Sequence, residues 1–169
     1  GALTLGRYTQ FGGGSVTMTD GLKAYFLTID SGSLTVTGDP QAITLRNQDI
    51  GYLEIGDGAR LFTGSSAQDA TEAAVPQLSG KTYVRITNAW DVTYQPGENG
   101  SGNAVTDIKF YNDALTLQGA LFTRTGHTQV GWATVDGGEK VYAFGGGYTT
   151  NAALTLYPVW QTDTYTITY

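Results

Sequence analysis

Short apolar-polar-apolar triplets recur along the first half of the chain. They lie at Leu3–Leu5, Val16–Met18, Leu27–Ile29, Leu34–Val36, Ile43–Leu45, Leu53–Ile55 and Val84–Ile86. Because side chains alternate between the two faces of a strand, this period of two predicts strands with one buried apolar face and one solvent-facing, Thr-rich face. Turn-forming pairs such as Asp20–Gly21 and Ser31–Gly32 separate the triplets. The pattern therefore predicts an all-β domain over residues 1–88.

The order of these strands is open between two arrangements. An antiparallel sandwich or meander is favoured, because a solenoid of so few coils would leave two open ends exposed. The alternative is a short β-solenoid, since triplets begin at Val16, Leu34 and Leu53, at intervals of 18 and 19 residues. Residues 65–76 are the one helix candidate because their first residues have capping-box spacing, and a loop is the alternative there.

The second half of the chain reads as one repeat unit followed by the start of another. Trp90–Tyr94 aligns with Tyr165–Tyr169 at an offset of 75 residues, with aromatic, β-branched, Thr and Tyr residues in the same order. Self-similarity at such a period is typical of supersecondary blocks strung along a surface protein. We therefore expect an all-β domain at 1–88, a repeat at 89–160 and the first strand of a following, truncated repeat at 161–169.

Residues 92–160 resemble the internalin B repeat family of bacterial surface proteins. Val92–Tyr94 is similar to the opening strand of the family, and Leu115–Leu117 to its next apolar segment. The central signature is similar at Phe122, Arg124, Gly126, Gly131 and Trp132, the glycine turn at Asp136–Gly138 with Tyr142, and the closing strand at Leu154, Leu156, Tyr157 and Trp160. The resemblance implies a small β-grasp-like domain, repeated in tandem as a stalk or spacer and without catalytic activity.

Two positions depart from the family pattern. His127 stands where the family usually has Tyr, and Gln129 stands where it usually has an aromatic residue. We therefore expect the middle strand of this repeat to be exposed differently or to contact a different partner.

The residues themselves place two indole rings in the interior of the repeat. Trp132 follows Gly131, where the backbone can approach closely, and Trp160 ends an alternating strand. Burying one such ring removes about 150 to 250 Å² from water, a large contribution in so small a domain. Arg124 is expected to satisfy turn carbonyls or stack on an aromatic such as Trp132, and binding of a ligand carboxylate is the alternative.

Composition and charge exclude several classes of function. The formal net charge is −6 and the nine Lys and Arg residues are scattered singly, whereas a nucleic-acid surface needs clustered cations. The absence of Cys excludes disulfides, thiolate zinc sites and cysteine nucleophiles. No apolar run approaches the roughly 18 to 20 residues that a membrane-spanning helix needs. We therefore expect neither a nucleic-acid partner nor a membrane span in this segment.

Candidates for catalytic chemistry are few. His127 is the only His, so a catalytic triad would depend on it and an all-histidine metal site is ruled out. The acidic candidates mostly lie beside Gly, where Asp is a turn former; they are Glu54, Asp57, Asp69, Glu72, Asp136 and Glu139. The sequence therefore predicts no catalytic residues, no cofactor and no metal site.

These patterns predict a non-catalytic module of a bacterial cell-surface or secreted protein, with a stalk, spacer or adhesion role. Its expected partners are a host or environmental protein or glycan and adjacent repeats of the same chain, and residues 165–169 are expected to pair with a sheet edge. The alternative is a carbohydrate-binding accessory module of a secreted polysaccharide-degrading enzyme. The candidate sugar platforms for this alternative are Tyr8, Tyr25, Phe26, Tyr52, Phe62 and Tyr83.

Overall fold

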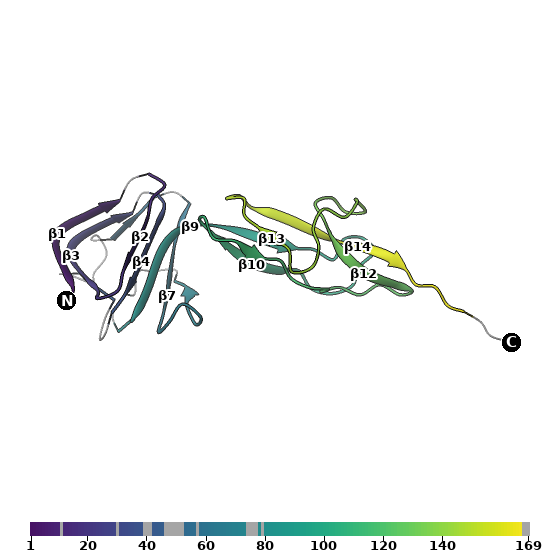
Figure 1. Cartoon of the computed structure of the whole chain (residues 1–169), viewed down its shortest axis with the longest axis horizontal. Coiled ribbons are helices and arrows are strands. Elements are labelled where there is room, and N and C mark those ends of the chain that lie inside the picture. Colours follow the sequence, from purple (N-terminus) through teal and green to yellow (C-terminus); the bar gives the residue numbers. More distant parts are fainter. Residues whose placement is uncertain are drawn as a thin grey trace. The chain divides into compact units, whose positions relative to one another are not determined.

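The computed structural model describes residues 1–10, 12–29, 31–38, 42–45, 53–56, 58–73, 78 and 80–166, without the side chains of residues 25, 44, 53 and 54. Within these residues every regular element is a β-strand, so the mainly β fold class is confirmed. The chain divides into two compact units, Gly1–Ala89 and Trp90–Tyr169 (Figure 1). Each unit has its own hydrophobic core.

The first sheet of the N-terminal unit is parallel. Its central strand β3 (Leu22–Ile29) pairs with β1 (Leu3–Gln10) on one side and with β5 (Ile43–Leu45) and β6 (Leu53–Ile55) on the other. Its apolar positions are those of the triplets, so the period of two in the sequence corresponds to strands in this sheet.

The second sheet of this unit has the order β2-β4-β9-β7-β8. The strands are β2 (Ser15–Met18), β4 (Ser33–Thr37), β7 (Ala59–Gly64), β8 (Thr71–Glu72) and the first half of β9 (Tyr83–Tyr94). β2 is parallel to β4, whereas β9 is antiparallel to both β4 and β7. This second sheet is therefore mixed.

The chain passes alternately between the two sheets, so that β1 and β2 form one coil and β3 and β4 form the next. Consecutive coils pair Leu3 with Leu22 and Ser15 with Ser33. These strands have the arrangement of a short β-solenoid, and the favoured antiparallel arrangement holds only where β9, β7 and β8 pair. The physical reason is that alternation shows which face of a strand is buried but not the direction of its neighbour.

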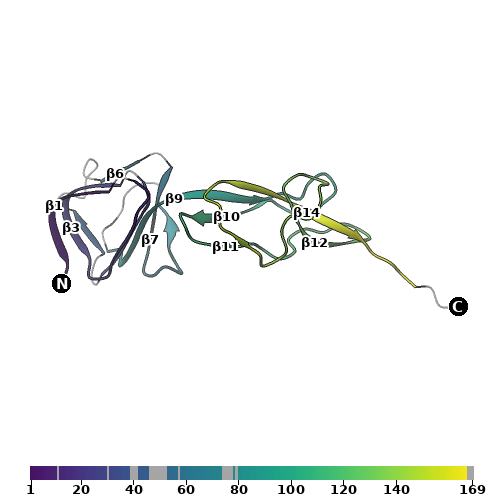
Figure 2. The ribbon, with the colours of Figure 1, turned by 45° about the horizontal axis from the view of Figure 1, so that its top comes forward.

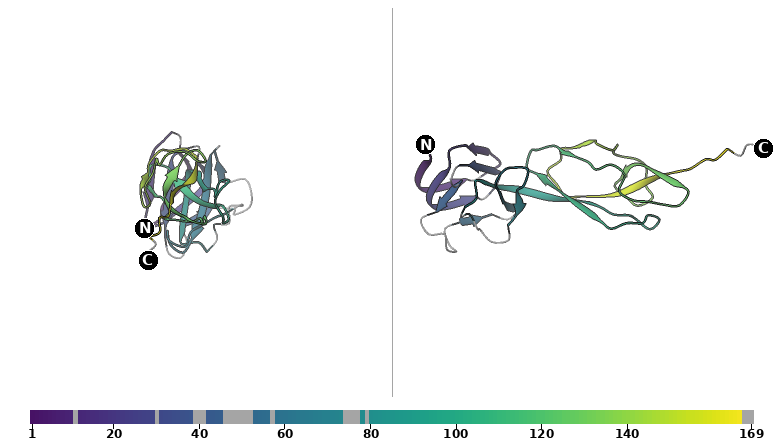
Figure 3. Two further views of the ribbon diagram at one scale, coloured as in Figure 1. Left: turned by 90° about the vertical axis from the view of Figure 1, so that its right-hand side faces the viewer. Right: turned by 90° about the horizontal axis from the view of Figure 1, so that it is seen from below.

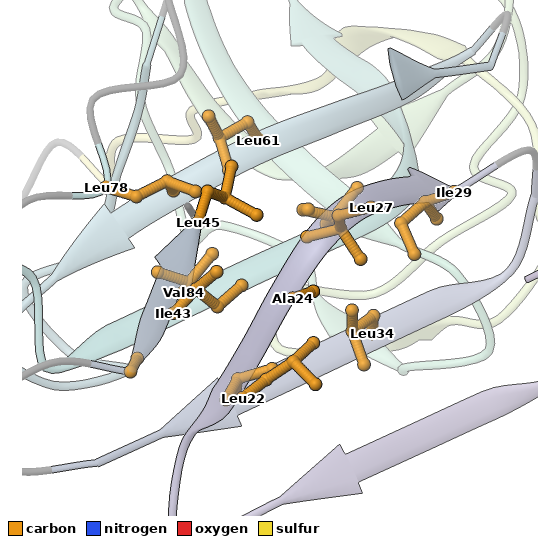
Figure 4. Packing of buried hydrophobic residues seen from close by; sticks show 13 residues of the cluster. Leu22, Ala24, Leu27, Ile29, Leu34, Ile43, Leu45, Leu61, Leu78 and Val84 are labelled. Carbon is orange, nitrogen blue, oxygen red and sulfur yellow. The ribbon is translucent and has the colours of Figure 1, made fainter. Parts of the chain in front are cut away.

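The core of the N-terminal unit lies between its two sheets. Leu27 and Ile29 of the first sheet gather with Leu34 and Leu61 of the second in one cluster of buried side chains (Figure 4). Ile86 of β9 pairs with both Leu34 and Leu61, so β9 lies between β4 and β7 and contributes its apolar face to this cluster.

Gln10 joins the ends of consecutive coils in this unit. Its side chain is buried, and its Nε2 donates to the carbonyl oxygens of Gly14 at 3.0 Å and of Ser31 and Ser33 at 3.3 Å. These carbonyl groups lie at the turns where the chain crosses between the sheets. The Gln10 amide therefore adds a side-chain donor to backbone acceptors at this junction, where the Gly14 carbonyl oxygen also accepts the Ser33 N–H at 2.9 Å.

Residues 65–73 do not form the helix that was one of two expectations for this segment. The backbone N–H groups of Ser65 and Ser66 donate to the Asp69 carboxylate at 3.2 and 2.6 Å, and both hydroxyl groups donate to it as well. These hydrogen bonds, above all that from the Ser65 hydroxyl, hold the pKa of Asp69 well below its usual range. The carboxylate thus closes a turn in place of a helix, and residues 74–76 of the candidate lie outside the described residues.

The second unit is built on a sheet with the order β10-β9-β14-β12. β10 (Val105–Phe110) pairs with β9, β14 (Leu154–Thr162) is parallel to β9, and β12 (His127–Ala133) is antiparallel to β14 (Figure 3). The first and last strands of the unit thus lie side by side and parallel at the centre of the sheet, as in a β-grasp domain. β11 (Leu115–Thr116) and β13 (Gly147–Tyr148) form a separate antiparallel ribbon. The position of β11 after β10 can be followed in Figure 2.

Residues 161 and 162 continue β14, because Gln161 pairs with Thr128 and Thr162 with His127. The described residues that follow, 163–166, lie outside strands, and the side chain of Tyr165 is 81% exposed. Residues 167–169 lie outside the described residues. The assignment of 161–169 to the first strand of a further repeat, and its pairing with a sheet edge, stay predictions.

Candidate functional site

Trp132 lies at the centre of the second core. It is fully buried on β12, and its ring centroid lies 4.8 Å from that of Tyr94, 6.0 Å from that of Phe122 and 6.1 Å from that of Phe144. The contacts with Phe122 and Phe144 are edge-on, an arrangement that the quadrupoles of aromatic rings favour. Trp132 therefore packs against aromatic residues from several segments of the unit.

The peptide groups of Gln118 connect the two largest of these rings. The Gln118 N–H donates to the Tyr94 hydroxyl at 3.1 Å, and the Gln118 carbonyl oxygen accepts from Trp132 Nε1 at 2.8 Å. The Gln118 side chain donates to both carboxylate oxygens of Asp107, at 3.1 and 3.0 Å. Burial, aided by the nearby Asp107 carboxylate, raises the pKa of Tyr94 to about 12. The sequence did not indicate Gln118, because its backbone forms these two hydrogen bonds and backbone groups are the same for nearly every residue type.

Four further signature residues surround these rings. Phe122 and Leu156 are buried in the core, while Tyr142 and Trp160 are partly exposed and pack against it. Of the two indole rings expected in the interior, Trp132 is therefore fully buried and Trp160 only partly. Tyr142 also pairs with Trp132 through its backbone. These side chains pack in or against the second core.

The two signature glycines serve two different purposes. A Cβ at Gly131 would collide with the Lys140 side chain and lie 2.8 Å from the Tyr142 carbonyl oxygen, so Gly131 lets β12 approach the segment that crosses it. Gly126 has φ of 66° in the turn that leads into β12, a backbone conformation that favours glycine. The position of Trp132 next to Gly131 thus has the close backbone approach that the sequence indicated.

Gln129, one of the two departures from the family pattern, is buried. Its Oε1 accepts hydrogen bonds of 3.1 Å from the backbone N–H groups of both Leu121 and Phe122. Its Nε2 is buried without a hydrogen-bond partner among the described residues. An aromatic residue could not satisfy the two N–H groups, so this glutamine replaces part of the packing by hydrogen bonding. His127 is partly exposed, and its Nδ1 lies 2.9 Å from the Thr125 carbonyl oxygen.

Arg124 makes neither side-chain contact that the sequence favoured. Its carbonyl oxygen accepts from the His127 N–H at 3.1 Å, but its guanidinium forms no hydrogen bond or ring contact within the described part of the chain. Trp132 is fully buried and in contact with Tyr94, Phe122 and Phe144, so its ring is not available for stacking by Arg124. Arg124 is partly exposed in the turn that leads into β12.

Lys109 is a second residue that the sequence did not single out. It is fully buried on β10, and its Nζ donates to the Phe110 carbonyl oxygen at 2.6 Å and to Asn151 Oδ1 at 3.0 Å. The ring centroid of Trp90 lies 5.9 Å from Nζ. Loss of hydration lowers the pKa of Lys109, and the Asp113 carboxylate opposes this shift. Sequence reasoning missed it because Lys is ordinarily a surface residue.

A groove of about 320 Å³ lies on the surface of the second unit. Its lining residues are Gln95, Pro96, Gly97, Glu98, Asp136 and Tyr157. The Asp136 carboxylate accepts the Glu98 backbone N–H at 2.8 Å and lies against Gly97, whose φ is 69°. Tyr157 of β14 is the one signature residue that lines this groove, and its side chain is partly exposed.

The comparisons with known proteins agree with this geometry. Residues 90–159 match the family model of the Listeria-Bacteroides repeat domain. The second unit is a bacterial surface repeat of the internalin B type. The resemblance inferred from the sequence is therefore confirmed for this unit. Comparison of the whole chain with curated proteins and with solved structures gave no significant match.

Outside the repeat domain, the aromatic residues of the first unit are mostly part of its packing. Phe62 and Tyr83 are buried, and Tyr8 is partly buried with its hydroxyl donating to Gln10 Oε1 at 3.0 Å. Phe26 is 40% exposed on β3, and the Arg7 guanidinium lies 5.2 Å from its ring centroid. The side chain of Tyr25 and the whole of Tyr52 lie outside the described residues. Phe26 is therefore the most exposed of the described candidate sugar platforms, with the Arg7 guanidinium over its ring.

The acidic candidates have structural partners rather than a common cleft. Glu72 is paired with Arg60, whose Nε lies 2.7 Å from Glu72 Oε1, and Asp69 is held in its serine turn. Asp136 belongs to the groove of the repeat domain, and Glu139 is exposed. The Glu54 side chain and Asp57 are not among the described residues. Within the part of the chain that the structure describes, His and acidic side chains do not gather in threes, and no helix is long and apolar enough to cross a membrane.

Proposed function

We propose that this chain is a non-catalytic module of a bacterial cell-surface or secreted protein, with a stalk, spacer and adhesion role. The observation that carries this proposal is the use of the family signature: Tyr94, Phe122, Trp132 and Leu156 are buried and fill the interior of the repeat domain. A domain whose signature residues pack in its core is suited to a structural role, in which it holds other parts of a protein in place.

The sheet order supports a role in tandem. Because the first and last strands of the repeat domain, β9 and β14, are parallel neighbours, the chain enters and leaves along the same direction. A unit with this property can be repeated along a line without reversing the chain. Adjacent repeats of the same chain are therefore the first partners that we propose, and edge pairing by residues 165–169 is a second.

Surface proteolysis tests the location. We expect proteinase K added to intact cells that make the parent protein to remove fragments containing residues 1–169, while a cytoplasmic marker protein stays intact. Adhesion is tested by coating microspheres with the 169-residue chain and measuring their retention on host cells and on polysaccharide films. Albumin-coated microspheres are the control. A parent protein that remains protected inside intact cells would contradict the proposal.

A carbohydrate-binding accessory module is the second candidate function. The observation that favours it is Phe26, which is 40% exposed on β3 with the Arg7 guanidinium over its ring. Aromatic rings on a flat sheet face are suited to stacking on sugar rings. Phe26→Ala should abolish pull-down of the chain by insoluble polysaccharides, whereas Val135→Ala, which removes another exposed apolar side chain, should not. Equal retention of both variants would eliminate this candidate.

A further inference from the structure

The groove of the repeat domain holds polar groups that the fold does not use. Gln95, Glu98 and Tyr157 are among its lining residues, and none of these three side chains hydrogen-bonds to another described residue. Tyr157 and Pro96 are the lining residues with largely apolar rings. Free donors and acceptors between apolar walls are the usual composition of a small-molecule site.

The groove is also fixed in shape. The Asp136 carboxylate receives the Glu98 N–H at 2.8 Å and packs on Gly97, where a Cβ would collide with it. The Gln95 N–H donates to the Leu156 carbonyl oxygen at 2.8 Å, which ties the other end of the segment to β14. Because both ends of residues 95–98 are held, little ordering is needed when a ligand enters.

We propose that this groove binds one hexose-sized unit of a neutral glycan. The Tyr157 ring offers a face for the C–H groups of a pyranose, the Glu98 carboxylate accepts hydrogen bonds from hydroxyl groups, and the Gln95 amide both donates and accepts. This mixture of donors and acceptors matches sugar hydroxyl groups, which both donate and accept. The volume of about 320 Å³ lies at the small end of the range for ligand sites.

The proposal rests on the adhesion role proposed above and places a glycan contact on the repeat domain rather than on the first unit. It gives the signature residue Tyr157 a purpose besides packing. It also requires that the contact involve few hydrogen bonds, so a single sugar unit should bind weakly, and several repeats would be needed for firm attachment.

NMR titration of the ¹⁵N-labelled 169-residue chain tests the proposal. The probes are the methyl glycosides of glucose, galactose, mannose and N-acetylglucosamine at millimolar concentration. We expect at least one of them to shift the backbone amide signals of Gln95, Gly97, Glu98 and Asp136. Glu98→Ala should weaken that binding at least about tenfold, the effect of losing a hydrogen bond to a charged group. The exposed Glu98 side chain has no described partner, so this variant keeps the fold.

The matched control is Glu139→Ala, which removes an exposed carboxylate outside the groove and should leave binding unchanged. Absence of groove shifts with all four glycosides overturns the proposal. Equal losses of sugar binding in Glu98→Ala and Glu139→Ala also overturn it. The proposal is overturned as well if lysine amide, and not the sugars, shifts the amide signals of the groove, because the groove would then bind a basic partner. Retention of chain-coated microspheres that persists without sugar binding overturns this site but leaves the adhesion role in place.

Discussion

The Tyr94 ring lies 4.8 Å from the Trp132 ring at an angle of 55°, and one residue, Gln118, hydrogen-bonds to both of them through its backbone. Tyr94 comes from β9 at the start of the repeat domain and Trp132 from β12 in its middle. The contact therefore joins segments that are far apart in sequence, and the stability of the domain should depend on it.

Trp132→Ala should unfold the repeat domain. Removing a buried Trp costs about 3 to 5 kcal/mol, and a domain of this size has about 3 to 5 kcal/mol of net stability. We expect the dispersed NMR amide signals of residues 90–160 to collapse. Tyr165→Ala, at a position 81% exposed, is the control and should leave them unchanged. A cooperative melt near that of the wild type would show that Trp132 is not needed for the core.

Alkaline pH should destabilise the repeat domain through Tyr94. Its pKa is raised from 10.0 to about 12, so the folded state holds this proton more tightly than the unfolded state. The stabilisation is therefore fully present below pH 10 and is lost as the pH rises from 10 to about 12. Tyr94→Phe should lack this dependence. Urea unfolding of both proteins across this range gives the difference in free energy of unfolding between the wild type and Tyr94→Phe. This difference should shrink as the pH rises. A difference that stays constant would contradict the raised pKa of Tyr94.

Gln129→Met should destabilise the repeat domain by about 2 kcal/mol, because it leaves the buried N–H group of Phe122 and the partly buried N–H group of Leu121 without an acceptor. Gln161→Met, on the exposed end of β14, is the matched control and should have little effect. Chemical denaturation of both variants gives the comparison. If Gln129→Met were as stable as the control, the side-chain oxygen of Gln129 would not be holding this segment.

Gly32→Ala should destabilise the first unit more than Gly12→Ala. Both glycines have positive φ, 90° and 77°, so both substitutions carry backbone strain of about 1 to 2 kcal/mol. At Gly32 the new Cβ would also collide with the Gly14 carbonyl oxygen and approach Gln10 Nε2, whereas at Gly12 nothing lies within 4 Å. Overpacking adds about 1 to 3 kcal/mol. Thermal melts of the two variants measure the difference, and equal melting temperatures would argue against the tight coil junction.

Lys109→Met should be neutral or slightly stabilising, although Lys109 is fully buried. Both of its acceptors keep another donor, since the Phe110 carbonyl oxygen also receives the Asp113 N–H at 3.2 Å and Asn151 Oδ1 receives the Asn112 N–H at 3.0 Å. The substitution also removes the cost of burying an ammonium group. Lys109→Ala, which leaves a cavity, should be clearly destabilising. A loss of stability with Met equal to that with Ala would mean that the charge itself is required.

Part of this structure follows from local pattern. The triplets of the first unit become strands because a period of two in hydrophobicity is a property of each strand by itself. Gly131 beside Trp132 predicted a close backbone approach, since the absence of a side chain is visible in the sequence. The family resemblance extended this to the repeat domain, where the signature residues Phe122, Trp132 and Leu156 are buried in the core.

The sequence by itself therefore determined the β class and the repeat domain. Alternation, glycine positions and aromatic signature residues are local features, so they can be recognised in the sequence without knowledge of the fold. Only the tertiary structure decided that β1 to β4 run as parallel coils, that β9 lies between β4 and β7, that Gln129 and Lys109 are buried, and that the Gln118 backbone bonds to Tyr94 and Trp132. The physical reason is that strand direction and the satisfaction of buried backbone groups depend on which distant segments meet. Residue type alone does not specify those encounters.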